Sequence, residues 1–190
     1  MMLTQIAQFL LSVFLQGFAS LLLFRFLLQW LRAPLRNPIG EFVMAITDFV
    51  VLRARRYIPS IWLLDTATLA LAFVVEFIYL ALTHVILAGH SLLHFPSLGL
   101  IVLSLVELLK MSVYLLMGSL IAQAILSWVS PHTPIAPLLS SITQRFLRPL
   151  QRVIPLIGNV DLSPLMLIVI CQIILFAPIA ILENMALRLF

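Results

Sequence analysis

Four long runs of apolar residues dominate the chain, and polar, basic or turn-forming residues separate them. The runs cover about residues 6–31, 62–88, 98–129 and 160–183. A helix needs about 20 apolar residues to cross the hydrocarbon core of a bilayer, so each run is long enough for one span. The runs are continuous, whereas the strands of a membrane β-barrel alternate apolar and polar residues in segments of about ten. The pattern therefore predicts an all-α membrane protein with four transmembrane helices.

Composition agrees with lipid as the main solvent. Hydrophobic residues make up 63% of the 190 residues and charged residues 9%, against about 25% charged in a soluble domain. The net charge is +4, but the basic residues gather in two connections, which favours an anionic membrane surface over nucleic acid as a partner. The one cysteine, Cys171, lies in an apolar run, which leaves no disulfide framework. The N-terminal run lacks a basic n-region and a small-residue cleavage site, so we expect a retained span.

The distribution of basic residues predicts the topology. Basic residues mark cytoplasmic connections, whereas the connection between the second and third spans has none. We therefore expect both termini outside and both basic connections in the cytoplasm. The basic residues between the first two spans are Arg32, Arg36, Arg53, Arg55 and Arg56, and those between the last two are Arg145, Arg148 and Arg152.

The chain also repeats itself. At a separation of 96 residues, Thr47 aligns with Thr143 and Arg56 with Arg152, and a shift to 98 aligns Trp30 with Trp128. Shared hydrophobicity alone does not explain identities at these residue types. We expect two repeats, residues 1–92 and 93–190, each a hydrophobic hairpin. Because each repeat contains two spans, the copies insert in the same sense and are parallel. The remaining identities at 96 are Pro38-Ile39 with Pro134-Ile135, Ile58-Pro59 with Ile154-Pro155, and Asp65 with Asp161.

Each basic connection contains an amphipathic segment. Apolar residues recur at helical spacing over residues 39–52 and again over 135–153, with polar residues opposite. We expect each segment to be an interfacial helix, with apolar side chains among the acyl chains and arginines among anionic head groups. The alternative is a helix packed against the ends of the spans. Pro149 should break the second segment into two short helices. The apolar stripes are Ile39, Phe42, Val43, Ile46, Phe49 and Val50, and Ile135, Leu138, Leu139, Ile142, Phe146, Leu150 and Val153.

The second basic connection resembles the signature of the YggT family of bacterial integral membrane proteins. The resemblance lies in the sequence from Arg145 to Pro155, RFLRPLQRVIP, followed by Gly158, Asp161, Ser163 and Pro164. The first repeat keeps Arg55-Arg56, Ile58-Pro59 and Asp65, but has Arg53 for Pro149, Trp62 for Gly158 and Ala67-Thr68 for Ser163-Pro164.

The family resemblance covers the whole chain and implies a duplicated unit in the bacterial cytoplasmic (inner) membrane. Members of the family have been linked to osmotic-stress tolerance and ion homeostasis. Chloroplast and cyanobacterial relatives are implicated in cofactor attachment to a cytochrome b-type protein and in division-related processes.

Polar residues within the spans are candidate sites, because a charge in lipid needs a partner. Glu76 lies near the middle of the second span, and Arg25 near the cytoplasmic end of the first. Side chains lean toward the N-terminus of their helix, so these two lean toward each other, and we expect them to pair. Their counterparts in the second repeat are Gln123 and Gln172. The set is either an interior polar network that fixes the bundle or a remnant of an ion path.

Other polar residues have simpler interpretations. Glu107 and Lys110 form an i, i+3 pair expected at a solvated helix entry. The pattern His90-x-x-x-His94 has the spacing of helical metal ligands but no carboxylate or cysteine nearby, so we expect no metal site. Asp65 and Asp161 stand where the chain re-enters the membrane and should cap helices. Gly118-x-x-x-Ala122 could be a close helix contact.

These observations leave three classes of function. The chain has no catalytic motif and no cofactor-binding motif, so an enzyme is not expected. We expect a non-enzymatic factor that docks or assembles other membrane proteins through its interfacial helices and arginines. The alternative is an osmotic-stress or ion-homeostasis protein with a transport-related role, which would need oligomerisation because four spans enclose little lumen. The expected partners are anionic lipids and an unidentified membrane protein, with a second copy of the chain as a further candidate.

Overall fold

The computed structural model describes residues 2–58, 65–88, 97–130, 133–153 and 161–189. Within these ranges the regular structure is entirely helical, and no strand occurs. The elements in chain order are α1 (Met2–Leu11), the π-helical turn η1 (Ser12–Gln16), α2 (Gly17–Trp30), α3 (Pro38–Ala54), α4 (Thr66–Ala88), α5 (Ser97–Val129), α6 (Ala136–Gln151), α7 (Ser163–Ile174), the π-helical turn η3 (Leu175–Ile179) and α8 (Ala180–Leu187).

Four continuous helical stretches are long and apolar enough to cross a membrane. They are Thr4–Trp30, Thr66–Ile86, Ser97–Ser127 and Ser163–Leu187. The four predicted spans are confirmed to within a few residues at most ends. The first and fourth stretches each contain one π-helical turn, and the turn in the fourth contains Pro178. A proline has no N–H to donate, and a π-helical turn is one way for a helix to continue past it.

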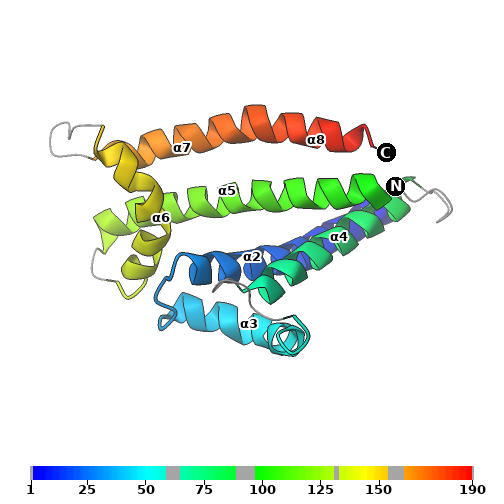
Figure 1. Cartoon of the computed structure of the whole chain (residues 1–190), viewed down its shortest axis with the longest axis horizontal. Helices are drawn as coiled ribbons and strands as arrows, with labels where there is room; N and C mark the ends of the chain where they lie inside the picture. The colour runs from blue at the N-terminus through cyan, green and yellow to red at the C-terminus, as the bar shows by residue number, and fades with distance from the viewer. Residues whose placement is uncertain (1, 59–64, 89–96, 131–132, 154–160, 190) are drawn as a thin grey trace.

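The long helices form a bundle around α5, which contacts α2, α4, α7 and α8. In Figure 1 both termini lie at one end of this bundle. Helix α3 lies beside α2 and the start of α4 in the half away from the termini, and α6 crosses α5 near the C-terminal end of that helix. The connections at that end are therefore helical and packed on the bundle, which places their polar residues next to the spans.

A tight turn after α2 sends the chain back toward the bundle. Arg32 adopts φ 53°, the left-handed conformation usually taken by glycine. Its N–H bonds to the carbonyl of Gln29 at 3.1 Å, and the N–H of Ala33 bonds to the carbonyl of Leu28 at 2.8 Å. This pair of bonds is a Schellman motif, and it buries Leu28 and Ala33 together.

Helix α3 begins at a well-formed cap. Asn37 Oδ1 accepts a hydrogen bond from the N–H of Gly40 at 2.9 Å, and Pro38 occupies the first helical position. Gly40 is required here by space, because a Cβ on it would overlap the carbonyl oxygen of Leu35. The close approach of these two backbones holds the start of α3 against the turn.

Most of the predicted apolar stripe of α6 faces the bundle, and Val153 after the end of the helix is exposed. Leu138, Leu139, Ile142 and Leu147 are buried against the spans. The prediction that this stripe lies among acyl chains is therefore wrong, and the alternative of a helix packed on the span ends describes α6. Pro149 does not divide the helix either, because it lies in the last turn and disrupts few hydrogen bonds before α6 ends at Gln151.

Helix α3 combines both arrangements. It buries Val43, Thr47 and Val51 against α2 and α4. Two aromatic residues of the predicted stripe, Phe42 and Phe49, remain exposed. One edge of its stripe thus packs inside the protein, and the other is free to meet lipid.

One of the core clusters that join the two repeats lies where the end of α2 meets the start of α6. Leu28 and Ala33 pack there with Leu138, Leu139 and Ile142. Beside this cluster, the guanidinium of Arg145 lies 5.2 Å from the centre of the Trp30 ring, a cation–π contact across the two halves.

The expected close contact at Gly118 is absent. A Cβ on Gly118 would meet nothing within 4 Å. Gly118 and Ala122 instead line a shallow cavity of about 250 Å³ beside α2.

Candidate functional site

Arg25 on α2 is the most deeply buried cation that the structure describes, with 2% of its surface exposed. Its Nη1 donates to Thr47 Oγ1 at 2.7 Å and lies 2.7 Å from Asp48 Oδ1. Both partners belong to α3, so a charge-assisted contact fixes α3 against α2. Asp48 is 36% exposed, so the ion pair lies between the bundle interior and the protein surface.

The predicted pair between Arg25 and Glu76 is wrong. The Glu76 side chain is fully buried, with Oε1 at 3.5 Å from Gln16 Nε2 and Oε2 without a partner. From the start of α4, Glu76 lies about 15 Å deep at 1.5 Å per residue, whereas Arg25 lies about 8 Å from the end of α2. The prediction failed because it considered only the spans, and α3 brings Asp48 closer to Arg25.

The second repeat has an uncharged version of the same contact. Gln123 on α5 corresponds to Arg25, and its Oε1 accepts a hydrogen bond from Thr143 on α6. Thr143 corresponds to Thr47, and both hydroxyls also lie within hydrogen-bond distance of the carbonyl four residues earlier, at 3.0 and 2.6 Å. Where the first repeat has Asp48, the second has Gln144, which is exposed.

Asp65 is the centre of a second polar contact in the first repeat. Its Oδ2 lies 2.5 Å from Arg55 Nη2, and its Oδ1 lies 3.4 Å from Arg55 Nε. It also accepts bonds from the N–H and the hydroxyl of Thr68, which makes it the predicted cap of α4. With its amide oriented to satisfy both groups, Gln29 donates to Asp65 at 2.9 Å and accepts from Arg55 at 3.2 Å. Asp65 thereby joins α2, α3 and α4.

The charge state of Asp65 follows from these partners. Burial opposes ionisation, but hydrogen bonds from Arg55 and Thr68 outweigh it and hold the pKa of the carboxyl below its ordinary value. The hydrogen bond from Asp65, partly offset by burial, raises the pKa of Arg55. Both groups are therefore charged at neutral pH.

Asp161 stands at the equivalent position in the second repeat but has weaker partners. Its Oδ2 accepts from Gln151 Nε2 at 2.8 Å, and its Oδ1 accepts from the N–H of Ser163 at 2.9 Å. The bond to Ser163 satisfies the first N–H of α7, although Leu162 occupies the formal cap position. The interactions with Ser163 are the main reason that the pKa of Asp161 lies below its ordinary value. Asp161 is thus an anion on a more exposed surface than Asp65.

Together these contacts define two junctions, one in each repeat. The first junction is charged. The second junction keeps the capping aspartate and has glutamine at each of the other positions where the first junction has a charged residue. The same replacement occurs at Glu76, whose counterpart Gln172 is exposed on α7 and does not join an interior network. Sequence reasoning found two of these four replacements. The pairs are Arg25 and Gln123, Asp48 and Gln144, Arg55 and Gln151, and Glu76 and Gln172.

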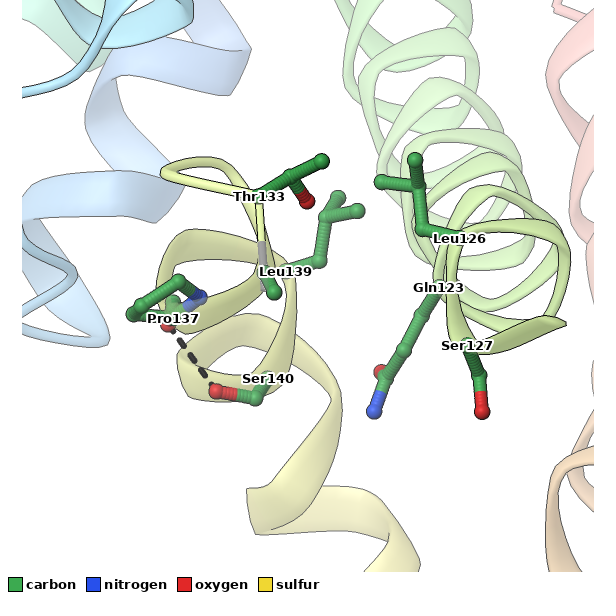
Figure 2. Close-up of a pocket in the computed structure, with 8 residues that line it drawn as sticks. Gln123, Leu126, Ser127, Thr133, Pro137, Leu139 and Ser140 are labelled. Carbon is green, nitrogen blue, oxygen red and sulfur yellow. Dashed lines mark hydrogen bonds between the residues drawn. The ribbon is translucent and has the colours of Figure 1, made fainter. Parts of the chain in front are cut away.

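Two cavities border the second junction. One, of about 520 Å³, lies between α5 and the start of α6, and the other, of about 580 Å³, lies between α5, the end of α6 and the start of α7. Both are lined by Gln123 and Ser127, and we call them together the second-repeat groove. Figure 2 shows Gln123 and Ser127 extending from α5 in the same direction, with Ser140 opposite on α6. Asp161 and Pro164 line the second cavity.

The remaining predicted surface residues lie as follows. Arg53, Arg56, Arg148 and Arg152 are exposed near α3 and α6, where they are free to meet head groups or a partner. Arg145 is also exposed, but its guanidinium lies over Trp30. The predicted motif residues Pro59, Pro155 and Gly158 lie outside the described residues, as do His90 and His94.

A third polar group lies in the half of the bundle nearer the termini. Lys110 on α5 lies 3.2 Å from Glu107 and 3.1 Å from Glu183 of α8. The expectation of a solvated i, i+3 pair missed Glu183, since sequence spacing cannot show a contact between distant spans. Within the described ranges, no group of three or more His, Cys, Asp or Glu residues is placed to hold a metal ion.

Comparison with known proteins identifies the family. The CCB3/YggT family model matches residues 4–86 and again 102–182. The YggT protein of Escherichia coli K12, named as uncharacterised, is 32% identical over 167 residues, which is 87% of this chain and 85% of that protein. A Vibrio alginolyticus protein named for its position in the proC 3′ region is 34% identical over 165 residues, 85% of this chain and 86% of its own length. An uncharacterised protein of Pseudomonas aeruginosa is 30% identical over 147 residues, 76% of this chain and 74% of that protein.

No solved structure matches the chain. The two-segment match agrees with the internal repeat found from the sequence, and each segment contains one junction and one pair of spans. The chain therefore belongs to the CCB3/YggT family, with two tandem copies of its unit.

Proposed function

We propose that this chain is a non-enzymatic docking or assembly factor of the bacterial cytoplasmic membrane. Its two repeats insert in the same sense, with the termini outside and α3 and α6 on the cytoplasmic side. The basic residues on α3 and α6 support this orientation, as does the position of both termini at the opposite end of the bundle. The exposed Phe42 and Phe49 suit contact with acyl chains, and the exposed Arg148 and Arg152 suit anionic head groups.

The observation that carries the proposal is the difference between the two junctions. In the first repeat, the long side chains of Arg25, Arg55 and Gln29 are used in contacts within the junction. Arg25 pairs with Asp48, and Arg55 and Gln29 both contact Asp65. In the second repeat, Gln123 accepts a hydrogen bond from Thr143 and, together with Ser127, also lines the two cavities. The groove offers hydrogen-bond donors and acceptors above apolar side chains, the arrangement found in sites that bind another molecule. The first repeat thus stabilises the bundle, and the second meets the partner.

A test is photocrosslinking in living cells with benzoylphenylalanine at Ser127 or Ser140, which line the groove. The matched control is Phe176, which is 87% exposed on η3 in the middle of the fourth span. Discrete protein adducts at the groove positions, absent at Phe176, are the expected result. Equal labelling at all three positions, or labelling of lipid alone, would exclude a protein docking site there.

One observation favours a second candidate, a role in osmotic-stress response or ion homeostasis. Glu76 is buried within a span with an unpartnered oxygen, and unpaired ionisable residues inside membranes often mark ion pathways. This role predicts that Glu76→Gln reduces growth after an osmotic shift. Variants of the groove that leave Glu76 intact would then grow as wild type. If the protein is a docking factor, the groove variants should grow less well and Glu76→Gln should grow as wild type.

A further inference from the structure

The first repeat provides an internal reference for what an aspartate at this position binds. Asp65 receives the guanidinium of Arg55, with Nη2 at 2.5 Å from Oδ2 and Nε at 3.4 Å from Oδ1. This two-point contact is the geometry in which arginine and carboxylate match best. Arg55 comes from the end of α3, so the cation reaches the aspartate from a helix at the membrane surface.

Asp161 is the residue that corresponds to Asp65 in the second repeat, and it has no such cation. Among the residues that the structure describes, no Lys, Arg or His forms an ion pair with it. Among the described residues, the hydrogen bonds that Asp161 accepts come from Gln151 and Ser163, which are both neutral. A carboxylate can accept about four hydrogen bonds, so these neutral partners leave it able to accept from a cation as well.

Space for the missing cation is present beside Asp161. The cavity of about 580 Å³ that Asp161 lines is bordered by Gln123, Ser127 and Gln151, all neutral. In the first repeat, Gln29 takes the position of Ser127 and contacts both members of the ion pair. The shorter Ser127 leaves room that Gln29 would occupy. Apolar side chains of α5, α6 and α7 also line the cavity and suit the methylene groups of a long basic side chain.

We propose that this cavity receives an arginine or lysine side chain of the partner protein, which pairs with Asp161 as Arg55 pairs with Asp65. The proposal rests on the docking function above and specifies its chemistry. The partner presents a basic residue at the membrane surface, at the level of the end of α6. In the first repeat, Asp65 pairs with an arginine of the same chain, whereas in the second repeat Asp161 pairs with a basic residue of another chain.

The experiment places benzoylphenylalanine at Leu165, which is 63% exposed and lines the cavity, and identifies the crosslinked segment by mass spectrometry. Two variants with opposite chemistry are compared in the same cells. Asp161→Asn removes the charge and keeps the shape, and Gln151→Arg supplies a cation from within the chain at the position of Arg55. Val153→Arg is the matched control, because it adds the same charge at a position directly after α6 that is 80% exposed and does not line the cavity.

The expected result is a crosslinked segment containing Arg or Lys, with yield reduced at least about tenfold by both Asp161→Asn and Gln151→Arg. The bound partner would cover Asp161 and its cation, and removing one member of a charge pair covered in this way weakens association strongly. Val153→Arg should keep the wild-type yield, and Gln151→Arg should unfold at a temperature no lower than wild type. A protein crosslink that persists in both test variants, or a segment without a basic residue, overturns the charge proposal and leaves the docking function standing. Crosslinks to lipid alone overturn both and assign the cavity to an amine head group.

Discussion

The two repeats allow the same substitution to be compared in two environments, Asp65→Asn and Asp161→Asn. At Asp65 every described partner is a donor: Arg55, Thr68 and Gln29 in its satisfied orientation. An asparagine would turn an NH₂ group toward these donors, and a guanidinium has no acceptor to offer in return. The buried conflict costs about 1–2 kcal/mol. Arg55 is 42% exposed, so loss of the ion pair adds at most about 1 kcal/mol.

At Asp161 the same change should be nearly silent. Gln151 can rotate its amide and present its oxygen to the new NH₂ group, while the oxygen of the asparagine still accepts from Ser163. The position is also exposed, and we expect a loss below about 0.5 kcal/mol.

The measurement is equilibrium unfolding of each purified variant in mixed micelles by titration with dodecyl sulfate, followed by far-ultraviolet circular dichroism. A loss of about 2 kcal/mol at Asp65 corresponds to a change of about 30-fold in the unfolding equilibrium constant. Wild type and Gln144→Leu, an exposed change on α6, provide the baseline. Equal losses at the two positions, or a larger loss at Asp161, would refute the assignment of a closed junction to the first repeat and an open one to the second.

Three further predictions follow from contacts described above. Hydrogen bonds keep the pKa of Asp65 below its ordinary value of 3.8 despite burial. The stability that this carboxylate contributes is therefore present above pH 3.8 and is lost as the pH falls through the lowered pKa. Below pH 3.8, the free energy of unfolding of Asp65→Asn should depend less on pH than that of wild type, as measured by acid unfolding. Gly40→Ala should cost about 1–3 kcal/mol through overlap with backbone, whereas Gly118→Ala, which meets open space, should gain up to about 1 kcal/mol in helix propensity. A double-mutant cycle with Trp30→Leu and Arg145→Met should give a coupling of about 0.5–1 kcal/mol in the same titration, and zero coupling would remove that contact as a link between the repeats.

The four spans were predictable because their length and hydropathy depend on the chain alone. The placement of α3 and α6 was not, because an apolar stripe such as Leu138, Leu139 and Ile142 suits acyl chains and protein equally well. What decides between them is the space that the ends of α2 and α5 leave, and this depends on the tertiary structure. The turn at Arg32, which directs α3 back along α2, has no glycine to reveal it.

The polar junctions were partly within reach of the sequence. The separation of 96 residues already aligned Arg55 with Gln151 and Asp48 with Gln144, and a comparison of charged positions between repeats would have found both pairs. The partner of Arg25 was beyond such a comparison, because a connection treated as a surface helix is not expected to supply a buried contact. The depth of a residue along a span suggests which charged residues need a partner. Only the packing of α3 shows that the carboxylate that pairs with Arg25 is Asp48.

Asp65 joins three helices that all precede residue 89, and this has a consequence for biogenesis. Once α4 has left the ribosome, Gln29, Arg55 and Thr68 are all available, so the first hairpin can lock before the insertion machinery receives the second. The later hairpin then docks on a finished template through Trp30 and Arg145. Under the docking function proposed above, the groove forms last, at the time when a newly inserted partner can reach it.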